Sequence, residues 1–305
     1  MKSVIVTGAS GFLGLPAVKH LLDLDYEVHA VASKSDLKID PHPSLYTHKF
    51  DLLDINEREK LFATIQPSHF LHLAWYVEHG KFWSSLQNID WLEASIDLLQ
   101  KFADGGGKRF VATGTCYEYD FVNANSLSET GAVLRPTSLY AASKVSAFHV
   151  MEALANLRQL SFGWGRIFFL FGERENENRL VPYVIRSLLH GDVARCSHGN
   201  QVRDFADTDF VANGLARFLD SDVQGAVNVC SGAGVSLREL IDQIIRIVGG
   251  RGSVDFGAIE APPDDPPVII GDTSRLVHEV GYKRKFDLSG DLERVVEWWK
   301  KYECD

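Results

Sequence analysis

The sequence is short of cysteine, of basic residues and of long hydrophobic runs. Its 305 residues include four cysteines, at positions 116, 196, 230 and 304, and none of them stands in a C-x-x-C pair. This spacing argues against a zinc cage and against a disulfide framework, and a reducing, cytoplasmic location is expected. The formal net charge is −10, so no basic surface for nucleic acid is expected. No apolar run approaches about 20 residues, so no membrane partner is expected either.

Strand-like and helix-like segments alternate along the first two-thirds of the chain. Short runs rich in β-branched or aromatic residues are separated by amphipathic stretches, a pattern typical of β-α-β units around a parallel sheet. Residues 12–24 and 85–103 each place apolar side chains on one helical face. The pattern predicts an α/β protein with a doubly wound parallel sheet. Its strands are expected at residues 4–7, 28–31, 46–50, 70–73, 109–112, 165–171 and 226–230.

A glycine-rich turn joins the first expected strand to the first expected helix. It reads Gly8-Ala9-Ser10-Gly11-Phe12-Leu13-Gly14. Backbone N–H groups at a helix N-terminus attract a diphosphate, and the missing side chains of glycine permit its close approach. An ordinary strand-to-helix turn is the alternative. In this βα context the turn predicts a Rossmann domain that binds a dinucleotide.

The end of the second expected strand bears on the choice of cofactor. An acidic residue there would bind the ribose 2′-hydroxyl of NAD, whereas a basic or hydroxyl residue accommodates the 2′-phosphate of NADP. The sequence has Ser33 and Lys34 at this place and no carboxylate. NADP is therefore the predicted cofactor and NAD the second choice, with a solvated loop lysine as the alternative reading. Asp51, after the third strand, is placed to contact the adenine or to cap a helix.

A tyrosine and a lysine four residues apart are the candidate chemistry. Tyr140 and Lys144 fall on one face of an expected helix, one turn apart. A neighbouring cation, together with an oxidised nicotinamide ring, would stabilise the phenolate and lower the pKa of Tyr140 toward neutrality. Tyr140 could then exchange a proton with a substrate oxygen.

Together these motifs make the chain resemble the extended short-chain dehydrogenase/reductases, the nucleotide-sugar epimerase, dehydratase and reductase group, over nearly its whole length. That family carries a Ser or Thr about 25 residues before the catalytic tyrosine, and Thr115 has this spacing to Tyr140. The resemblance implies that Thr115 polarises the substrate carbonyl, that Tyr140 is the acid/base, and that Lys144 holds the ribose and tunes Tyr140. The turn, the second strand and the resemblance together place cofactor contacts at Gly8, Ser10, Gly11, Phe12, Leu13, Gly14, Ser33, Lys34, Asp51, Leu52, Leu73, Ala74, Trp75, Asn88, Lys144 and Phe168.

The resemblance extends to the substrate side. The run Gln201-Val202-Arg203-Asp204-Phe205 resembles a family motif whose arginine grips the diphosphate of a nucleoside-diphosphate sugar, although a surface Arg/Asp pair is the alternative. Residues 178–182 resemble the stretch that closes over the nucleotide, and residues 232–237 and 256–260 resemble 4-ketoreductases of the CDP-abequose synthase type. A homodimer through the helices near 86–103 and 139–158 is implied. The expected substrate contacts are Tyr76, Thr115, Arg179, Leu180 and Arg203.

Two departures from the family pattern bear on the reaction. The family's 4,6-dehydratases follow the catalytic threonine with Asp-Glu, whereas Cys116 and Tyr117 follow it here. Because the Asp-Glu pair is missing, dehydration is not expected. Phe169 stands where an asparagine often meets the substrate phosphates, so the usual pose of the sugar nucleotide is not expected to carry over unchanged.

The predicted function is NADPH-dependent reduction of a keto group on a nucleoside-diphosphate deoxy-sugar. An epimerase with a tightly held nicotinamide cofactor and a non-catalytic NADP sensor are the alternatives. Histidines 72, 79 and 198 lack metal-ligand spacing, so no metal is expected. The predicted domains are a dinucleotide-binding domain at 1–171, with a return strand within about 201–230, and a smaller substrate lobe made of 172–200 and 231–305.

Overall fold

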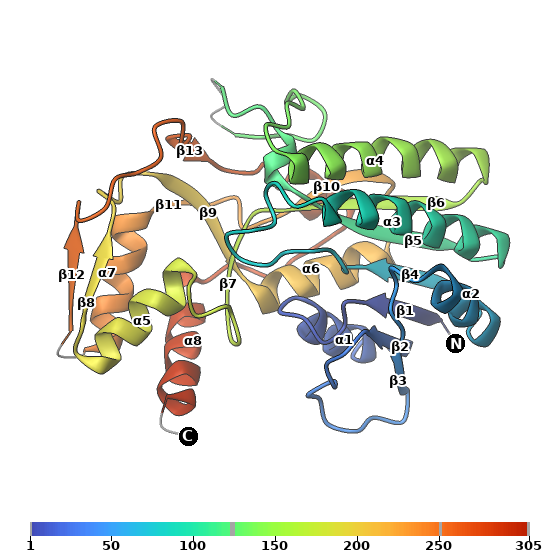
Figure 1. Cartoon of the computed structure of the whole chain (residues 1–305), viewed down its shortest axis with the longest axis horizontal. Coiled ribbons are helices and arrows are strands. Elements are labelled where there is room, and N and C mark those ends of the chain that lie inside the picture. Colours follow the sequence, from blue (N-terminus) through green and yellow to red (C-terminus); the bar gives the residue numbers. More distant parts are fainter. Residues whose placement is uncertain (1, 123–125, 250–251, 304–305) are drawn as a thin grey trace.

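A seven-stranded parallel sheet forms the larger part of the molecule (Figure 1). The computed structural model describes residues 2–122, 126–249 and 252–303. All neighbouring strands of this sheet pair in parallel, in the order β10-β6-β5-β4-β1-β2-β3. The strands are β1 (Ser3–Thr7), β2 (Glu27–Ala32), β3 (Leu45–Lys49), β4 (His69–His72), β5 (Arg109–Thr115), β6 (Ser161–Ile167) and β10 (Gly225–Val229).

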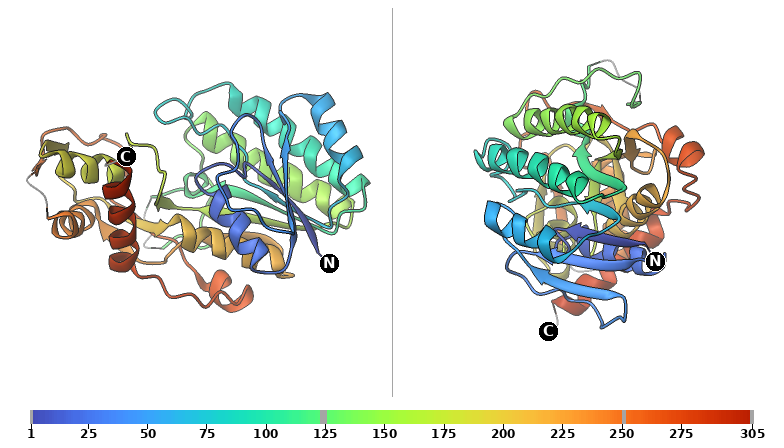
Figure 2. Two further views of the ribbon diagram at one scale, coloured as in Figure 1. Left: turned by 90° about the horizontal axis from the view of Figure 1, so that it is seen from below. Right: turned by 90° about the vertical axis from the view of Figure 1, so that its right-hand side faces the viewer.

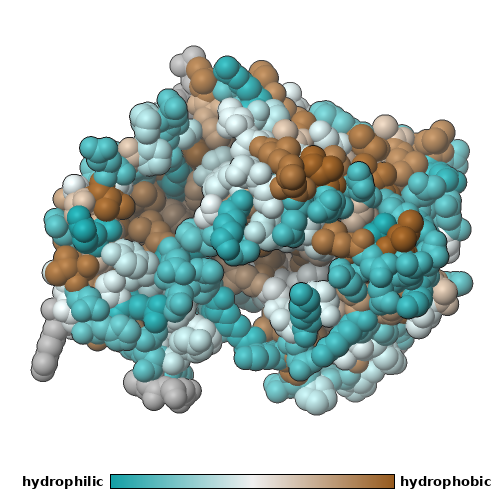
Figure 3. Space-filling model, in the orientation of Figure 1, coloured by the Kyte–Doolittle hydropathy of each residue, from teal (hydrophilic) through white to brown (hydrophobic). Residues whose placement is uncertain are grey.

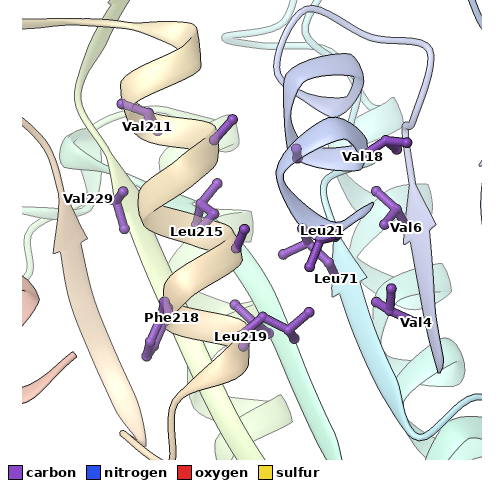
Figure 4. Packing of buried hydrophobic residues seen from close by; sticks show 14 of the residues in the cluster. Val4, Val6, Val18, Leu21, Leu71, Val211, Leu215, Phe218, Leu219 and Val229 are labelled. Carbon is purple, nitrogen blue, oxygen red and sulfur yellow. The ribbon is translucent and has the colours of Figure 1, made fainter. Parts of the chain in front are cut away.

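Helices cover both faces of this sheet, as the end-on view in Figure 2 shows. On one face α1 (Gly14–Leu22) and α6 (Thr208–Asp220) pack apolar side chains onto β1, β4 and β10 (Figure 4). On the other face lie α2 (Ile55–Thr64), α3 (Gln87–Asp104) and α4 (Leu139–Leu157). Every residue of β4 and β5 is buried, because a parallel sheet covered by two helical layers has no solvent face. The predicted doubly wound α/β fold is confirmed.

The strand order reverses between β1 and β4, which are neighbours although two strands separate them in sequence. At such a switch point the two connecting loops leave the sheet in opposite directions and open a crevice at the carboxyl ends of the strands. The ends of β1 and β4 are Thr7 and His72. The glycine turn and the Leu73–Ala74 loop therefore flank this crevice.

A smaller lobe lies beside the sheet (Figure 2, left). Its helices α5 (Leu180–His190), α7 (Leu237–Val248) and α8 (Leu288–Tyr302) share a hydrophobic core. Two small sheets complete it: β7 (Phe169–Phe171), β9 (Val202–Asp207), β11 (Gly234–Ser236) and β13 (Val268–Ile269) form one, and β8 (Val193–Cys196) with β12 (Ser253–Phe256) forms the other. Short helical turns η1 (Cys116–Glu118) and η2 (Arg275–Glu279) follow β5 and β13.

Two expectations about this half of the chain need correction, and one is confirmed. The single strand expected at 165–171 is two strands, because the chain leaves the central sheet at Phe168, whose ring packs in a separate cluster with Cys116 and Cys230. The expected return to the central sheet within 201–230 is made by β10, whereas β9 pairs with β7, β11 and β13. The segment with Leu276 and Tyr282, expected in the lobe, joins the core beneath α1 and α6.

No helix within the described residues is both long enough and apolar enough to cross a membrane. Cys116, Cys196 and Cys230 are buried free thiols, and Cys304 lies outside the described residues.

Candidate active site

The glycine turn has a conformation that side chains would prevent. Gly8 has φ +66°, and a Cβ there would lie 3.0 Å from the backbone N of Ala74. A Cβ on Gly14 would lie 2.0 Å from the carbonyl oxygen of Gly8. The turn leads into α1, whose N-cap residue Leu13 makes no capping hydrogen bond with its side chain, and the first turn of α1 carries no acidic residue. Unpaired N–H groups and a positive helix end fit the diphosphate of a dinucleotide.

A buried hydrogen-bond chain ties this turn to the loop after β4. Thr7 Oγ1 accepts from the backbone N of Leu73 (3.1 Å) and of Ala74 (3.2 Å), and it lies 2.8 Å from His72 Nδ1. His72 Nε2 lies 2.8 Å from Ser95 Oγ, whose hydroxyl donates to a backbone carbonyl. The Thr7 hydroxyl therefore donates to Nδ1, and Nε2–H donates to Ser95. Burial, and secondarily the positive charge of Lys144, lowers the pKa of His72 to about 3, so this histidine is a neutral structural link.

The cofactor-selecting segment lies on the surface. Ser33 and Lys34 follow β2 and are exposed. Asp51 is exposed and accepts from the backbone N of Leu53 (3.1 Å), while Asp54 is the residue that caps α2. Leu52 is buried. The structure thus leaves Asp51 available for the predicted adenine contact and removes its alternative role as helix cap.

The structure brings Thr115, Tyr140 and Lys144 together where β5 ends against α4. Tyr140 and Lys144 are both buried there, Thr115 is near enough to the Tyr140 phenol to influence its pKa, and Lys144 Nζ donates to the Thr113 carbonyl oxygen (2.9 Å). Burial raises the pKa of Tyr140 above its ordinary value, with the Thr115 hydrogen bond acting in the opposite direction. The lowering of this pKa that was expected from Lys144 together with an oxidised nicotinamide is therefore not seen in the protein alone, in which burial dominates. Tyr140 is a phenol at neutral pH.

Trp75 and Asn88 hold Lys144 in place. The Lys144 ammonium lies 3.7 Å from the centre of the Trp75 ring, a cation–π distance. Trp75 Nε1 donates to Asn88 Oδ1 (2.9 Å), and Asn88 Nδ2 donates to the carbonyl oxygens of Phe82 (2.7 Å) and Ser85 (2.9 Å). The amide of Asn88 is thus used by the protein itself. Burial lowers the pKa of Lys144 to about 7. Among the described residues its Nζ donates one hydrogen bond, to the Thr113 carbonyl, so its other N–H groups can reach a ribose hydroxyl.

Glu118 holds the backbone of Thr115, and none of the sequence motifs indicates this role. It is fully buried, and it accepts from the backbone N of Thr115 (2.9 Å), from Trp164 Nε1 (3.0 Å) and from Arg166 Nε (2.6 Å). Arg166 also donates to the Tyr119 hydroxyl (2.9 Å). In the sequence Glu118 is simply a glutamate that follows a strand. Its role comes from the buried Arg166, which is far away in sequence but lies on the neighbouring strand β6. The ion pair with Arg166 keeps the Glu118 carboxylate in place beside Thr115.

The residues expected to contact the substrate differ in their burial and in their present partners. Arg203 is buried, and its Nη2 donates to Asp265 (2.6 Å), so in this structure the guanidinium binds a carboxylate where a diphosphate was expected. Arg179, at the N-cap of α5, acts electrostatically on Tyr140. Tyr76 is half-buried and donates to Glu78 (2.8 Å).

A cavity of about 470 Å³ opens in the smaller lobe between α5, β8 and α7. Asn178, Leu180 and Tyr183 line it on one side and Cys196, Leu237 and Ile259 on another. The predicted nucleotide-closing stretch thus borders a real cavity. Among the described residues no three His, Cys, Asp or Glu side chains lie together in a way that could hold a metal ion.

The comparisons with known proteins agree with this architecture. The sequence pattern of the NAD dependent epimerase/dehydratase family matches residues 4–230. The chain belongs to this family. It is 28% identical to a CDP-abequose synthase of Salmonella typhimurium, over 96% of this chain and 97% of that protein. A UDP-N-acetylglucosamine 4-epimerase of Methanobrevibacter ruminantium, solved with UDP-N-acetylmuramic acid, has the same fold, with a TM-score of 0.89, 24% identity and 99% of each chain covered.

A third relative, MoeE5, was solved in complex with UDP-glucuronic acid and NAD. Its TM-score is 0.84 at 25% identity, with 98% of this chain and 99% of that chain covered. The protein is thus an NAD(P)-dependent oxidoreductase of the extended short-chain dehydrogenase/reductase type.

Glu175 is a second buried carboxylate that the sequence motifs did not indicate. It lies in the β7–α5 connection, is 5% exposed, and none of the described residues donates a hydrogen bond to its Oε2. Burial raises its pKa to about 8, with the positive charge of Arg179 acting in the opposite direction. Its neighbours along the chain are charged, so the sequence signal is that of a solvated loop.

Glu175 predicts a pH-dependent stability. In the folded protein it keeps its proton up to about pH 8, whereas in the unfolded chain it loses it near pH 4.5. The folded state binds more protons in this interval, so the free energy of unfolding falls as pH rises through it. Glu175→Gln is expected to remove this fall, and to be more stable than the parent at pH 9 by on the order of a few kcal/mol.

The measurement is urea unfolding at pH 4, 6, 8 and 9. Exposed Glu177 in the same loop, which pairs with Arg186, provides the control Glu177→Gln, for which no such trend is expected. A parallel pH dependence of Glu175→Gln and the parent would contradict the assignment.

Proposed function

We propose that the protein uses NADPH to reduce a keto group on a nucleoside-diphosphate deoxy-sugar, as 4-ketoreductases do. The observation that carries this proposal is that Thr115, Tyr140 and Lys144 are buried together at the end of β5. A phenol beside a threonine hydroxyl can hydrogen-bond a carbonyl oxygen and protonate it as negative charge develops.

The chain's own residues account for the proton in this reduction. A reduced dinucleotide, with its diphosphate held at the glycine turn, would supply the hydride to the carbonyl carbon. Tyr140 transfers its Oη proton to the carbonyl oxygen, which becomes the alcohol, and Thr115 donates a hydrogen bond to that oxygen. Lys144, which is 4% exposed, would hold the ribose and stabilise the tyrosinate that remains. One ketone, one hydride and one proton give one alcohol.

Dehydration finds no support in the residues beside Thr115. Burial raises the pKa of the Cys116 thiol and of the Tyr117 phenol above their ordinary values. Neither group is ionised at neutral pH. Glu118, the adjacent carboxylate, is held by Arg166, Trp164 and the Thr115 backbone. A 4,6-elimination needs a free acid and a free base beside Thr115, and these residues do not supply them. What this chain offers is Tyr140, a proton donor for a carbonyl oxygen.

The substrate nucleotide is proposed to occupy the cavity bordered by Asn178 and Leu180. Arg179 stands between these two residues in the sequence, and its charge acts on Tyr140. The CDP-sugar name of one relative and the UDP-sugars bound to two others support a nucleoside diphosphate as the handle. Arg203 would contact the diphosphate after exchanging its bond with Asp265.

The decisive assay mixes the purified protein with NADPH and nucleotide-linked 4-keto-6-deoxy sugars and follows nicotinamide absorbance together with the sugar products. Stoichiometric loss of NADPH supports the reductase. Interconversion of sugars without net loss identifies an epimerase instead, and binding of NADPH without any turnover identifies a sensor.

NADPH preference is proposed to depend on Lys34. Lys34→Ala is expected to lower kcat/KM for NADPH by roughly tenfold or more, because a charged hydrogen bond to the 2′-phosphate is lost, and to leave activity with NADH unchanged. Steady-state kinetics with both cofactors measures this. Lys38→Ala, an exposed lysine four residues on, is the control. An equal effect of Lys34→Ala on NADPH and NADH would refute the assignment.

A homodimer through α3 and α4 is also proposed. The two helices pack side by side (Figure 1), and their outer surface exposes apolar side chains (Figure 3). Leu86 just before α3 is 76% exposed and Ile89 in α3 is 38% exposed, while Val150 and Leu157 in α4 are 46% and 78% exposed. Exposed apolar groups gathered over two helices are typical of an interface.

A further inference from the structure

Glu175 carries a buried oxygen atom for which the described residues supply no partner. The side chain is 5% exposed, and its Oε2 forms no hydrogen bond with any residue that the structure describes. Buried polar atoms in native proteins are nearly always hydrogen-bonded, because an unpaired one has lost its water without replacement. This oxygen is therefore a candidate contact for a group that the protein binds.

The backbone next to Glu175 passes close to the glycine turn. Gly172, the first residue after β7, lies near enough to the Glu175 carboxyl for its backbone N–H to influence the pKa of that group, although burial has the larger effect. A Cβ on Gly172 would lie 3.3 Å from the Phe12 ring. Phe12 belongs to the turn that fits the diphosphate of a dinucleotide. Glu175 therefore lies close to the diphosphate end of the cofactor site.

Arg179 connects Glu175 to the other end of this site. It stands four residues further along the chain, at the N-cap of α5. Its positive charge acts on the carboxyl of Glu175 and on the phenols of Tyr140 and Tyr117. Because the interaction between charges weakens with distance, these side chains lie in one region. Glu175 is thus near both the glycine turn and the candidate proton donor Tyr140.

The nicotinamide ring of a bound dinucleotide must lie between these two places. Its diphosphate belongs at the glycine turn, and its reacting carbon belongs beside the carbonyl that Tyr140 is proposed to protonate. The ring bears a carboxamide, whose oxygen accepts a hydrogen bond and whose NH2 group donates one. Burial raises the pKa of Glu175 to about 8. At neutral pH its carboxyl therefore offers the complementary pair, an acceptor oxygen and a donor O–H.

We infer that the Glu175 carboxyl binds the carboxamide of the nicotinamide ring through two hydrogen bonds and so orients the ring for hydride transfer. A carboxylic acid and a primary amide can pair in this way because each group donates once and accepts once. This inference rests on the proposed function for the place of the cofactor, whereas neither the sugar nor the direction of hydride transfer enters it. Binding measured without substrate therefore tests it separately.

The charge of Glu175 distinguishes the two redox states of the cofactor. The oxidised ring is positively charged and the reduced ring is neutral, so an ionised Glu175 favours the oxidised form. Arg179 is the charged side chain that acts on Glu175. The other charged side chains of the connection and of the facing start of α6 are paired elsewhere or exposed: Glu173 and Asp207 pair with Arg294, and Arg174 and Glu177 are exposed. Preference for the oxidised cofactor is thus expected to rise as pH passes about 8.

The test is equilibrium binding of cofactors, without sugar, followed by tryptophan fluorescence at pH 7. It compares the oxidised cofactor, NADP or NAD, whichever binds more tightly, with its 3-acetylpyridine analogue, in which a methyl group replaces the carboxamide NH2. The parent is expected to bind the analogue roughly tenfold more weakly, because one hydrogen bond is lost and a Glu175 oxygen again lacks a partner.

Three variants assign this difference to Glu175. Glu175→Leu is expected to bind the cofactor and the analogue with similar affinity. Glu175→Gln keeps one acceptor and one donor group and is expected to retain the roughly tenfold ratio. Glu177→Gln, at an exposed position of the same connection, is the matched control and is expected to behave as the parent. Thermal denaturation checks that each variant folds.

A second measurement follows the ratio of the Kd of the reduced cofactor to that of the oxidised cofactor between pH 6 and pH 9.5. In the parent this ratio is expected to rise by roughly five- to tenfold above pH 8, and in Glu175→Gln it is expected to stay level there. Lys144, whose pKa is about 7, titrates in both proteins, so the difference between them isolates Glu175.

Equal affinity of the parent for the cofactor and its analogue, or an unchanged affinity ratio in Glu175→Leu, overturns the inference. The same pH trend in Glu175→Gln and the parent also overturns it. The expected binding pattern without any reduction of a keto sugar supports the inference and refutes the proposed reduction, so the two failures are distinguishable.

Discussion

Replacing Tyr140 with phenylalanine is expected to lower kcat/KM for ketone reduction by about 10²- to 10⁴-fold, the usual contribution of a positioned proton donor. The change removes one hydroxyl and leaves the ring, which packs edge-on against Phe82 at 4.8 Å and Trp83 at 5.9 Å. The fold and the affinity for NADPH are therefore expected to persist. Nicotinamide absorbance measures the rate, and fluorescence titration measures NADPH binding.

Tyr26→Phe is the matched control for this prediction. Tyr26 is also a buried tyrosine with a hydrogen-bonded hydroxyl, 2.9 Å from Asp220, but it lies beneath α1 away from the crevice. It is expected to keep full activity. Retention of every activity in Tyr140→Phe would show that the proton comes from another group, and an equal loss in Tyr26→Phe would show that the effect is structural.

The largest expected effect on stability comes from Glu118→Ala, about 3–5 kcal/mol of unfolding free energy. Glu118 and Arg166 form an ion pair in which the two side chains are 0% and 1% exposed. Removing the carboxylate leaves the guanidinium buried without its counter-charge, and it also removes the acceptor of Trp164 Nε1 and of the Thr115 backbone N. Urea unfolding at neutral pH measures the loss.

Two further variants separate this cause from a general intolerance of substitution. Glu118→Leu combined with Arg166→Met removes both charges and is expected to be more stable than Glu118→Ala, because no buried charge remains unpaired. Glu78→Ala breaks the exposed pair with Lys81 and is expected to leave unfolding nearly unchanged. A double variant less stable than Glu118→Ala would contradict the electrostatic explanation.

Much of the cofactor half of the site was predictable because its signals are local. Gly8 and Gly14 follow a strand within a few residues, and the structure confirms the tight turn that they make possible. Tyr140 and Lys144 are four residues apart in one helix, so helical geometry alone places them together. The expected strands of the central sheet were found to within a few residues, except the one that divides at Phe168.

The roles of Trp75, Asn88 and Glu118 could not be predicted from their neighbours in sequence. Asn88 was expected to touch the cofactor, but its amide is engaged by Trp75 and two backbone carbonyls. Trp75 follows β4 and Lys144 lies in α4, so the cation–π contact between them forms only when these two segments pack together. Such partners are set by packing between distant segments, which periodicity and motif spacing do not report.

The sequence by itself determined the doubly wound sheet, the glycine turn and the Tyr140 and Lys144 pair, since strand alternation, backbone freedom and helical spacing act over short stretches of chain. Thr115 was indicated by the resemblance to the family. Only the tertiary structure decided the electrostatic state of those groups and which side chains from separate segments surround them. Burial keeps Tyr140 protonated and lowers the pKa of Lys144 to about 7, and Trp83, Tyr117 and Phe169 meet from three separate segments. Desolvation and side-chain contact depend on what covers a residue, and that is settled only when the chain has folded.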